Sequence, residues 1–589
     1  MQAATTISSA ISTSFKLKSP LSLSLSLCLV SFLFAFTLIG CGSSGSGDQK
    51  KESGYVVKFY DVNLDLNYTL SVPTTTDSIN LPTLKSDLDL PPALYAASSA
   101  VDLASNPSYP VTGNTNLYGV PNVKEIRTEL ELNDIRFDID TVYLEFYDVN
   151  ISRITGAYIL LNDITLTSAT LDADKGWSPI GTRTFFAPFT GIFNGNGYKI
   201  SGLWINSPSI SDSDVVGLFG YIDGLGGYFD GLGGYVDGLG GGAQVKNLGV
   251  LIDNAKGGVQ GYAGSVGGIA GFVKSAFITN SYVAGNISGD SHVGAIAGFV
   301  SYYSEVKDSY STGNISGGDR VGGIAGTLNA SSIINGYSTG NISGDYGAVG
   351  GIAGVMSASS IINGYSTGNI SGNHYVGGIA GDFGGSSIIN SYSTGNVSGS
   401  SAVGGIAGVM YSDSSIKNSY AMGNVSGDYS EGADGDNVGG IAGDVSLSSI
   451  VNSYATGNVS GINNVGGIAG SAYISSITAN SAINSAIISD DDSNASRVVG
   501  IIYGGATLSN NFALDTMTVN SVVYDGATTD HNGTSKSIDD LTTPTALYSG
   551  AINGDGLGGL GWQFGDDDDH PWKIDANKND GYPYLYWQE

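Results

Sequence analysis

A six-residue phrase, Val-Gly-Gly-Ile-Ala-Gly, recurs along the middle of the chain and constrains the fold more than any other feature. Copies begin at Val266, Val321, Val349, Val376, Val403, Val438 and Val465, with the variant Val-Gly-Ala-Ile-Ala-Gly at Val293. Successive copies start 27, 28, 28, 27, 27, 35 and 27 residues apart. A fixed period in this range is typical of a solenoid, in which each unit buries its apolar side only against its neighbours. The long interval holds the acidic stretch 428–437, which we expect to be a surface loop.

The residue types favour strands over helices in each unit. Glycine interrupts the chain every few residues, which disfavours helix, whereas β-branched residues are abundant. In the unit around Ile416, the next position is Lys417, and other units place Ile, Val or Thr there. A position that accepts lysine faces water, so Ile416 is predicted to face inward, together with Asn418 and Tyr420 two and four residues on. The sequence therefore predicts an all-β, right-handed parallel β-helix with a rise of about 4.8 Å per coil.

This reading explains the recurrent phrase. Valine and isoleucine are expected to fill the core. The glycines are expected to allow positive φ and close backbone approach where the stacked coils bend. The asparagines equivalent to Asn418 are predicted to form an inward ladder that bonds to the turn backbone, and the tyrosines equivalent to Tyr420 an inward aromatic column.

The first 54 residues have the composition of an export signal and a tether. An apolar run, 21–39, follows Lys16 and Lys18, and it ends in Leu-Ile-Gly-Cys at Cys41. This ending resembles the lipobox of bacterial lipoproteins. The resemblance implies a signal peptide at 1–40, cleavage before Cys41 and a diacylglycerol on its thiol, with an uncleaved membrane helix as the alternative. Residues 41–54 are then a flexible tether. Gly42 is not the aspartate that often marks inner-membrane retention, so we expect secretion across the inner membrane and an outer-membrane, cell-surface location.

The remainder divides by composition. Residues 55–156 contain two alternating stretches and are predicted to be a small N-terminal β region or a spacer. Residues 157–220 are expected to form the leading coils, and 221–242 are a glycine-rich insertion built on three copies of a seven-residue phrase. Residues 243–535 carry the repeats, and the Trp/Tyr-rich residues 536–589 are expected to cap the array.

The repeats resemble the GLUG repeats of bacterial surface proteins. The matching segment is Ile-Val-Asn-Ser-Tyr-Ala-Thr-Gly-Asn-Val-Ser-Gly at 450–461, with flanking similarity at 189–197, 572–574 and 581–585. Members of that family are mostly secreted or cell-surface proteins, some with adhesive roles, and one relative carries a protease domain beside its repeats. The resemblance covers roughly residues 157–589.

Charge and motifs narrow the chemistry. Lysine and arginine number 23 against 53 acidic residues, for a formal net charge of -30, so a nucleic-acid partner is not expected. No metal-binding or nucleophile motif surrounds the four histidines, and His292 and His374 are expected to be exposed turn residues. No catalytic residue, cofactor or metal site is predicted, although weak calcium binding by acidic loops stays open. Four aspartates that recur after a Ser-Gly turn could line one edge: Asp290, Asp319, Asp345 and Asp428.

The sequence favours a protein attached to the membrane through lipid on Cys41, whose coils and loops bind a host, cell-surface or glycan ligand. The alternative is a polysaccharide-degrading β-helix enzyme, since parallel β-helices host such sites where acidic side chains of adjacent coils converge. Ice binding by a column of threonines is a third hypothesis, weakened because each coil has one such threonine and Met422 interrupts the column.

Overall fold

The computed structural model describes residues 55–588 with gaps, the longest being 81–94, 225–241 and 543–559. The expected signal peptide, the tether with Cys41, and most of the glycine-rich insertion lie outside the described residues. Within the described part, no helix is both long and apolar enough to cross a membrane.

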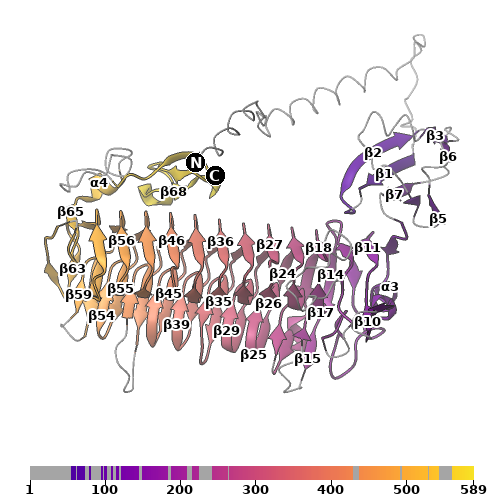
Figure 1. Cartoon of the computed structure of the whole chain (residues 1–589), viewed down its shortest axis with the longest axis horizontal. Helices are drawn as coiled ribbons and strands as arrows, with labels where there is room; N and C mark the ends of the chain where they lie inside the picture. The colour runs from indigo at the N-terminus through magenta and orange to yellow at the C-terminus, as the bar shows by residue number, and fades with distance from the viewer. Residues whose placement is uncertain are drawn as a thin grey trace, which may run out of the picture.

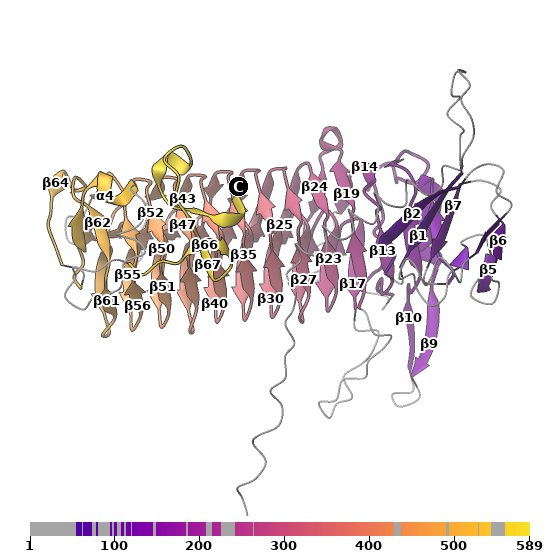
Figure 2. The same cartoon turned by 90° about the horizontal axis from the view of Figure 1, so that it is seen from above.

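The repeats form a parallel β-helix, as the sequence predicts (Figures 1 and 2). In one coil the strands are β34 (Val349–Gly350), β35 (Ala353–Ser357), β36 (Ser360–Ile362), β37 (Tyr365–Ser366) and β38 (Ile370–Ser371). Equivalent strands of successive coils pair in parallel and in register, for example Ile361 with Ile388.

Four long sheets result, and we name them A to D. Sheet A has 13 described strands, from β8 (Lys124–Ile126) to β61 (Thr507–Ser509), and sheet B has 13, from β12 (Ile164–Thr165) to β65 (Thr534–Lys536). Sheet C has 20, from β15 (Ile205–Ser207) to β64 (Val522–Val523), and sheet D has 10, from β17 (Phe219–Asp223) to β60 (Val499–Tyr503). The insertion between Val403 and Val438 leaves the register intact, because these two valines pair directly.

Sheet A confirms the predicted alternation. Ile361 is fully buried, whereas Ile362 beside it is half-buried on the outer face. The inward column is continuous through Ile333, Ile361, Ile388, Ile416, Ile450 and Ile477, and all of them are fully buried. Lys417 occupies the outward position in register with Ile389, as expected.

The asparagines and tyrosines do not face inward as predicted. Asn363 has a φ of 55°, in the left-handed region that asparagine tolerates, so the chain turns a corner there. Its side-chain amide donates to Asn335 Oδ1 at 3.1 Å, so the asparagines do form a ladder, but it runs along the outside of the corner. Because the corner breaks the alternation, Tyr365 faces outward and Ser366 inward. The tyrosine rings stack on one another, with centroids 4.6 Å apart between Tyr337 and Tyr365.

Serines, rather than the asparagines predicted from the repeat pattern, supply the inward polar side chains. Ser391 Oγ accepts the Gly364 N–H of the preceding coil at 3.0 Å and donates to Ile389 O at 2.9 Å. Each such serine satisfies a buried backbone N–H where the chain turns, which is required because an unpaired buried donor is costly.

The glycines of the recurrent phrase are needed for space rather than for φ. None of Gly350, Gly351 and Gly354 has a left-handed φ. A Cβ on Gly351 would lie 2.0 Å from the carbonyl oxygen of Gly378 in the next coil. The expectation of positive φ is therefore wrong for this motif, and close approach of stacked backbones is the reason for the glycines.

The N-terminal β region contains a five-stranded sheet that includes β1 (Tyr55–Tyr60), β2 (Leu66–Val72) and β7 (Thr115–Tyr118). It contacts the leading coils through an ion pair between the buried Lys246 and the exposed Asp65, with Nζ 2.7 Å from Oδ1. Coil stacking starts earlier than residue 157, because β8 pairs in parallel with β11 (Ala157–Leu160). The segment 129–134, between the predicted strands, is helix α3 (Glu129–Asp134), begun by a Thr128–Glu131 capping box.

The C-terminal end of the array is closed by Arg497, which lies one residue past the Gly466–Ser496 register pair and so replaces a motif glycine. Its fully buried guanidinium donates to Gly533 O at 2.7 Å and to Ser535 Oγ at 3.0 Å. In contrast to the predicted cap, the Trp/Tyr-rich segment folds back along the flank of the helix (Figures 1 and 2). There Trp587 stacks against Tyr392, with ring centroids 5.6 Å apart, because the outward tyrosine column offers an aromatic surface to cover.

Candidate ligand-binding surfaces

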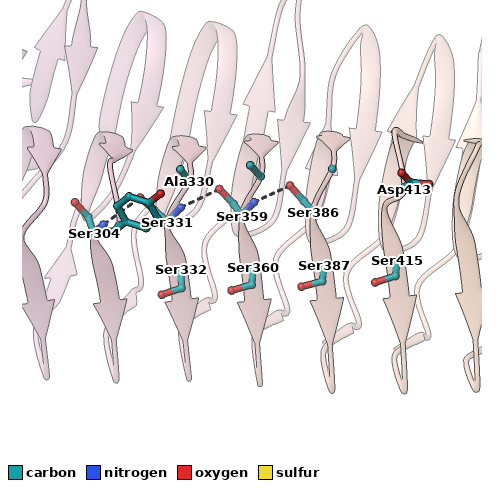
Figure 3. A pocket seen from close by; sticks show the side chains of 13 residues that line it. Ser304, Ala330, Ser331, Ser332, Ser359, Ser360, Ser386, Ser387, Asp413 and Ser415 are labelled. Carbon is teal, nitrogen blue, oxygen red and sulfur yellow. Dashed lines mark hydrogen bonds between the residues drawn. The ribbon is translucent and has the colours of Figure 1, made fainter. Parts of the chain in front are cut away.

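A serine-lined groove follows the corner between sheets D and A over several coils (Figure 3). Its inner hydroxyls are already used: Ser359 Oγ accepts the Ser331 N–H at 3.2 Å and donates to Ser357 O at 2.7 Å. An outer row of hydroxyls lines the mouth, at Ser332, Ser360, Ser387 and Ser415. A second hollow continues it from Asp413 to Thr507. The groove offers hydroxyls and one carboxylate, but little to orient a ligand.

A different groove, which we call the tyrosine groove, crosses sheet C near its start. Its floor is a row of polar side chains in register across four coils: Gln260, Ser288, Ser316 and Ser343. The next residues form a parallel row of glycines, Gly261, Gly289, Gly317 and Gly344. They leave room for the core valines, since a Cβ on Gly289 would lie 2.9 Å from Val266 Cγ2. Tyr262 lies at one end and Tyr346 at the other, and these side chains are 57% and 69% exposed.

Two carboxylates line the tyrosine groove. Asp290 follows Gly289, and Asp345 follows Gly344, so they occupy equivalent positions two coils apart. Between them Gly318 leaves room: a Cβ there would lie 2.7 Å from Asp290 Oδ1 and 3.5 Å from Tyr346 Cδ2. Among the described residues no salt bridge involves Asp290 or Asp345.

The four aspartates predicted to form one edge are therefore divided. Asp290 and Asp345 share the tyrosine groove, but Asp319 lies one residue further along its strand, where it pairs with Arg320 at 3.4 Å. Asp428 lies beside the insertion, and residues 429–436 are outside the described part. In the ranges that the structure describes, no three His, Cys, Asp or Glu side chains are grouped as a metal site.

A polar cluster adjoins this surface at the corner of sheets C and D. Arg320 Nη1 lies 3.0 Å from His292 Nε2, and His292 Nδ1 lies 2.8 Å from Thr327 Oγ1. Burial, with a smaller contribution from the Arg320 charge, lowers the pKa of His292 to about 4. The neutral ring thus accepts from Arg320 at Nε2 and donates from Nδ1. His292 is half-buried, so the expectation of an exposed turn residue is wrong for it, whereas His374 is exposed.

Asp382 is the least satisfied group of the cluster. Its Oδ1 is buried and has no hydrogen-bond partner, while Tyr411 bonds to the carboxylate. Burial raises the pKa of Asp382, against the opposing effects of Tyr411 and Arg320. A buried carboxyl group with a raised pKa is a candidate proton donor, and the charge of Asp319, which pairs with Arg320, contributes to raising that pKa.

Sequence reasoning singled out Asp290, Asp319 and Asp345, but it missed Tyr262, Tyr346 and Asp382. Tyr346 occupies a turn position that varies among units, where Ser291 and Asp319 stand in earlier coils. Asp382 stands in register with Val355 and Val409. Comparing the residues at equivalent outward positions of successive units could have identified Tyr346 and Asp382. The proposed lipidation residue, Cys41, lies outside the described residues.

Comparison with known proteins gives limited further information. No protein-family model matches the chain. A stretch of 63 residues is 43% identical to a protein of Evansella cellulosilytica named "Putative Gly-rich membrane protein"; this stretch is 11% of the present chain and 7% of that protein's length. A crystal structure described as "a putative immunoglobulin A1 protease from Bacteroides ovatus" aligns over 79% of this chain and 92% of its own, with 17% identity and a TM-score of 0.29. A TM-score of this size supports no inference about the present chain.

Proposed function

We propose that this protein is a lipid-anchored, cell-surface β-helical rod that binds a host, cell-surface or glycan ligand through side chains on its outer faces. Lipid on Cys41 would attach it to the outer membrane, and residues 42–54 would separate the rod from the lipid. The resemblance of the repeats to GLUG repeats and the name of the Evansella relative support a surface location.

The observation that carries the proposal is the separation of core and surface in each coil. The inward columns and the serine ladder maintain the fold, whereas outward positions in register vary freely, as with Ile389 and Lys417. Open grooves cross several coils on different faces. A scaffold of this kind can present side chains for binding without disturbing its core.

The test is attachment by cells that express the full-length chain. We expect such cells to adhere to host matrix, to partner cells or to a glycan-coated surface, and Cys41→Ser to abolish fatty-acid labelling and surface display. Deletion of residues 221–241 tests whether the glycine-rich insertion contributes. Failure of displayed protein to attach to any of these surfaces would refute the binding role.

Degradation of a polysaccharide is the second candidate, and the cluster around Asp382 is the observation that favours it. A hydrolase needs two carboxyl groups in different environments, and Asp382 is buried with a raised pKa whereas Asp319 forms an ion pair with Arg320. Release of soluble sugars by the purified chain, lost in Asp382→Asn and in Asp319→Asn, would establish the enzyme. Unchanged polymer length after prolonged incubation would exclude this activity for the polymers tested.

A further inference from the structure

We propose that the tyrosine groove of sheet C binds a linear, neutral oligosaccharide, held between Tyr262 and Tyr346 over the polar floor. This inference rests on the proposed binding function and assigns it a place and a class of ligand. The groove is distinct from the serine-lined groove, since the two share no lining residue.

The dimensions of the groove follow the coil repeat. Tyr262 follows β20 (Val259–Gly261), and Tyr346 follows β33 (Ile342–Gly344), with β25 (Ile287–Gly294) and β29 (Ile315–Gly322) between them. Three coil steps therefore separate the two tyrosines, which is about 14 Å along the axis. One coil step is close to the length of one sugar residue in an extended chain, so the groove accommodates about three residues in matching register.

The composition of the groove suits sugars. The two tyrosines expose large ring surfaces to solvent. Covering such a ring with an apolar surface is favourable, so these rings are suited to contact a ligand. Sugar rings offer such a surface through their C–H faces and offer hydroxyls at their edges. The floor supplies matching hydrogen-bond partners in the serine hydroxyls and in the Gln260 amide, whose Nε2 donates to Gly257 O at 2.8 Å.

The charge of the groove selects neutral over acidic glycans. Asp290 and Asp345 are among the lining residues, and no lysine or arginine is. Carboxylates accept hydrogen bonds from sugar hydroxyls but repel uronates, sulfates and phosphates. The net charge of the chain, -30, adds to this repulsion at long range.

The geometry near Gly318 fits a shaped site. Asp290 Oδ1 and Tyr346 Cδ2 both lie over this glycine, so the carboxylate and the ring edge are neighbours over the third of the four coils. The backbone fixes this arrangement, because the Tyr346 and Asp345 N–H groups donate to Gly318 O and Gly317 O at 2.8 and 2.9 Å. A ring and a carboxylate held together in this way can contact one face and one hydroxyl of the same sugar.

The experiment uses the purified full-length chain on an array of neutral linear glycans, followed by calorimetric titration with cellotriose, laminaritriose and chitotriose, and with trigalacturonate as the acidic probe. We expect binding of at least one neutral trisaccharide and weaker binding of trigalacturonate. Tyr262→Ala and Tyr346→Ala are each expected to weaken the neutral interaction about tenfold. Tyr303→Ala is the matched control, since Tyr303 is 85% exposed in the serine-lined groove and should leave affinity unchanged.

A second pair of variants tests the charge argument. Asp290→Asn with Asp345→Asn should increase trigalacturonate binding relative to the unmodified chain. No binding to any neutral glycan, equal binding in the Tyr262 and Tyr303 variants, or preference for the acidic probe would each overturn the assignment. If cells still attach when the groove carries either tyrosine substitution, the groove is not the attachment site, but the proposed attachment function is retained. If the purified chain binds the glycan but displayed protein does not attach cells, the groove assignment is retained and the attachment function is refuted.

Discussion

Replacing Ile361 with lysine is the sharpest test of the coil assignment, because the adjacent residue provides its own control. Ile361 is fully buried in the column of sheet A, and Ile362 is half-buried on the outer face. Lysine already stands at the outward position in another coil, at Lys417. Ile361→Lys should therefore disrupt the array, whereas Ile362→Lys should be tolerated.

The magnitude follows from the burial. Loss of the buried isoleucine costs about 2 kcal/mol. A lysine in that position must be neutral, and deprotonating a group of pKa about 10.4 at pH 7 costs about 5 kcal/mol. The sum, about 7 kcal/mol, is comparable to the whole stability of a typical domain. Ile362→Lys is expected to change stability by less than about 1 kcal/mol.

Hydrogen exchange read by mass spectrometry is the suitable assay, because a solenoid does not unfold as one two-state unit. We expect Ile361→Lys to remove amide protection in its own coil and in the coils on either side, around residues 333–389. Ile362→Lys should retain the protection of the unmodified chain. Equal protection in the two variants would mean that Ile361 is not sealed in a core, and the reasoning would fail.

Three further predictions concern the glycines, His292 and the closing segment. Gly351→Ala should lower the melting temperature strongly, because its Cβ would lie 2.0 Å from a carbonyl oxygen. Gly197→Ala is the control, at an open position with a left-handed φ of 81°, and it should lower the stability by only about 1 kcal/mol and the melting temperature only slightly. The lowered pKa of His292, about 4, means that the unfolded chain binds this proton more tightly, so stability should fall by up to about 3 kcal/mol as pH drops from 6.5 to 4. His292→Gln should remove that part of the pH dependence, as read by the shift of the denaturant midpoint between pH 7 and pH 5 relative to the unmodified chain. An imidazole that titrates near 6.5 by NMR would contradict this prediction. Trp572→Ala should cost about 3–5 kcal/mol and expose Tyr420 and Tyr454 to solvent quenchers; unchanged tyrosine accessibility would argue against flank packing.

The architecture could be predicted because the spacing of one motif is a direct record of the coil. A period near 27 residues, with Ile416 next to Lys417, was sufficient to give a parallel β-helix and the identity of its inward column. The leading coil was missed because β8 carries no copy of the motif and is recognised only by pairing with β11.

The orientation of the Asn-Ser-Tyr segment could not be extrapolated from the strand before it. Alternation holds only while the backbone stays extended, and Asn363 leaves that conformation with a φ of 55°. Because the residue at this position is left-handed, the tyrosines after it face outward and serines make the inward hydrogen bonds. The position of the closing segment was mispredicted for the same reason, since its tryptophans cover the outward tyrosine column.

The candidate sites were less predictable than the fold, because they combine residues of several coils. Tyr262 and Tyr346 are 84 positions apart in the sequence and share one groove only after stacking. Asp382 approaches Tyr411 of the following coil for the same reason. Identifying such pairs required the register, which the sequence constrained only approximately at the turns.

The strict pairing of Val403 with Val438 across a length change has a consequence for how such a chain can evolve. Duplicating or deleting one whole unit would alter the reach of the molecule by a single fixed increment, about 4.8 Å, and leave every other layer undisturbed. An indel of one residue within a strand would instead turn its buried row toward water. Selection on reach can therefore act through unequal recombination between copies, whereas selection on recognition acts through point changes at outward sites.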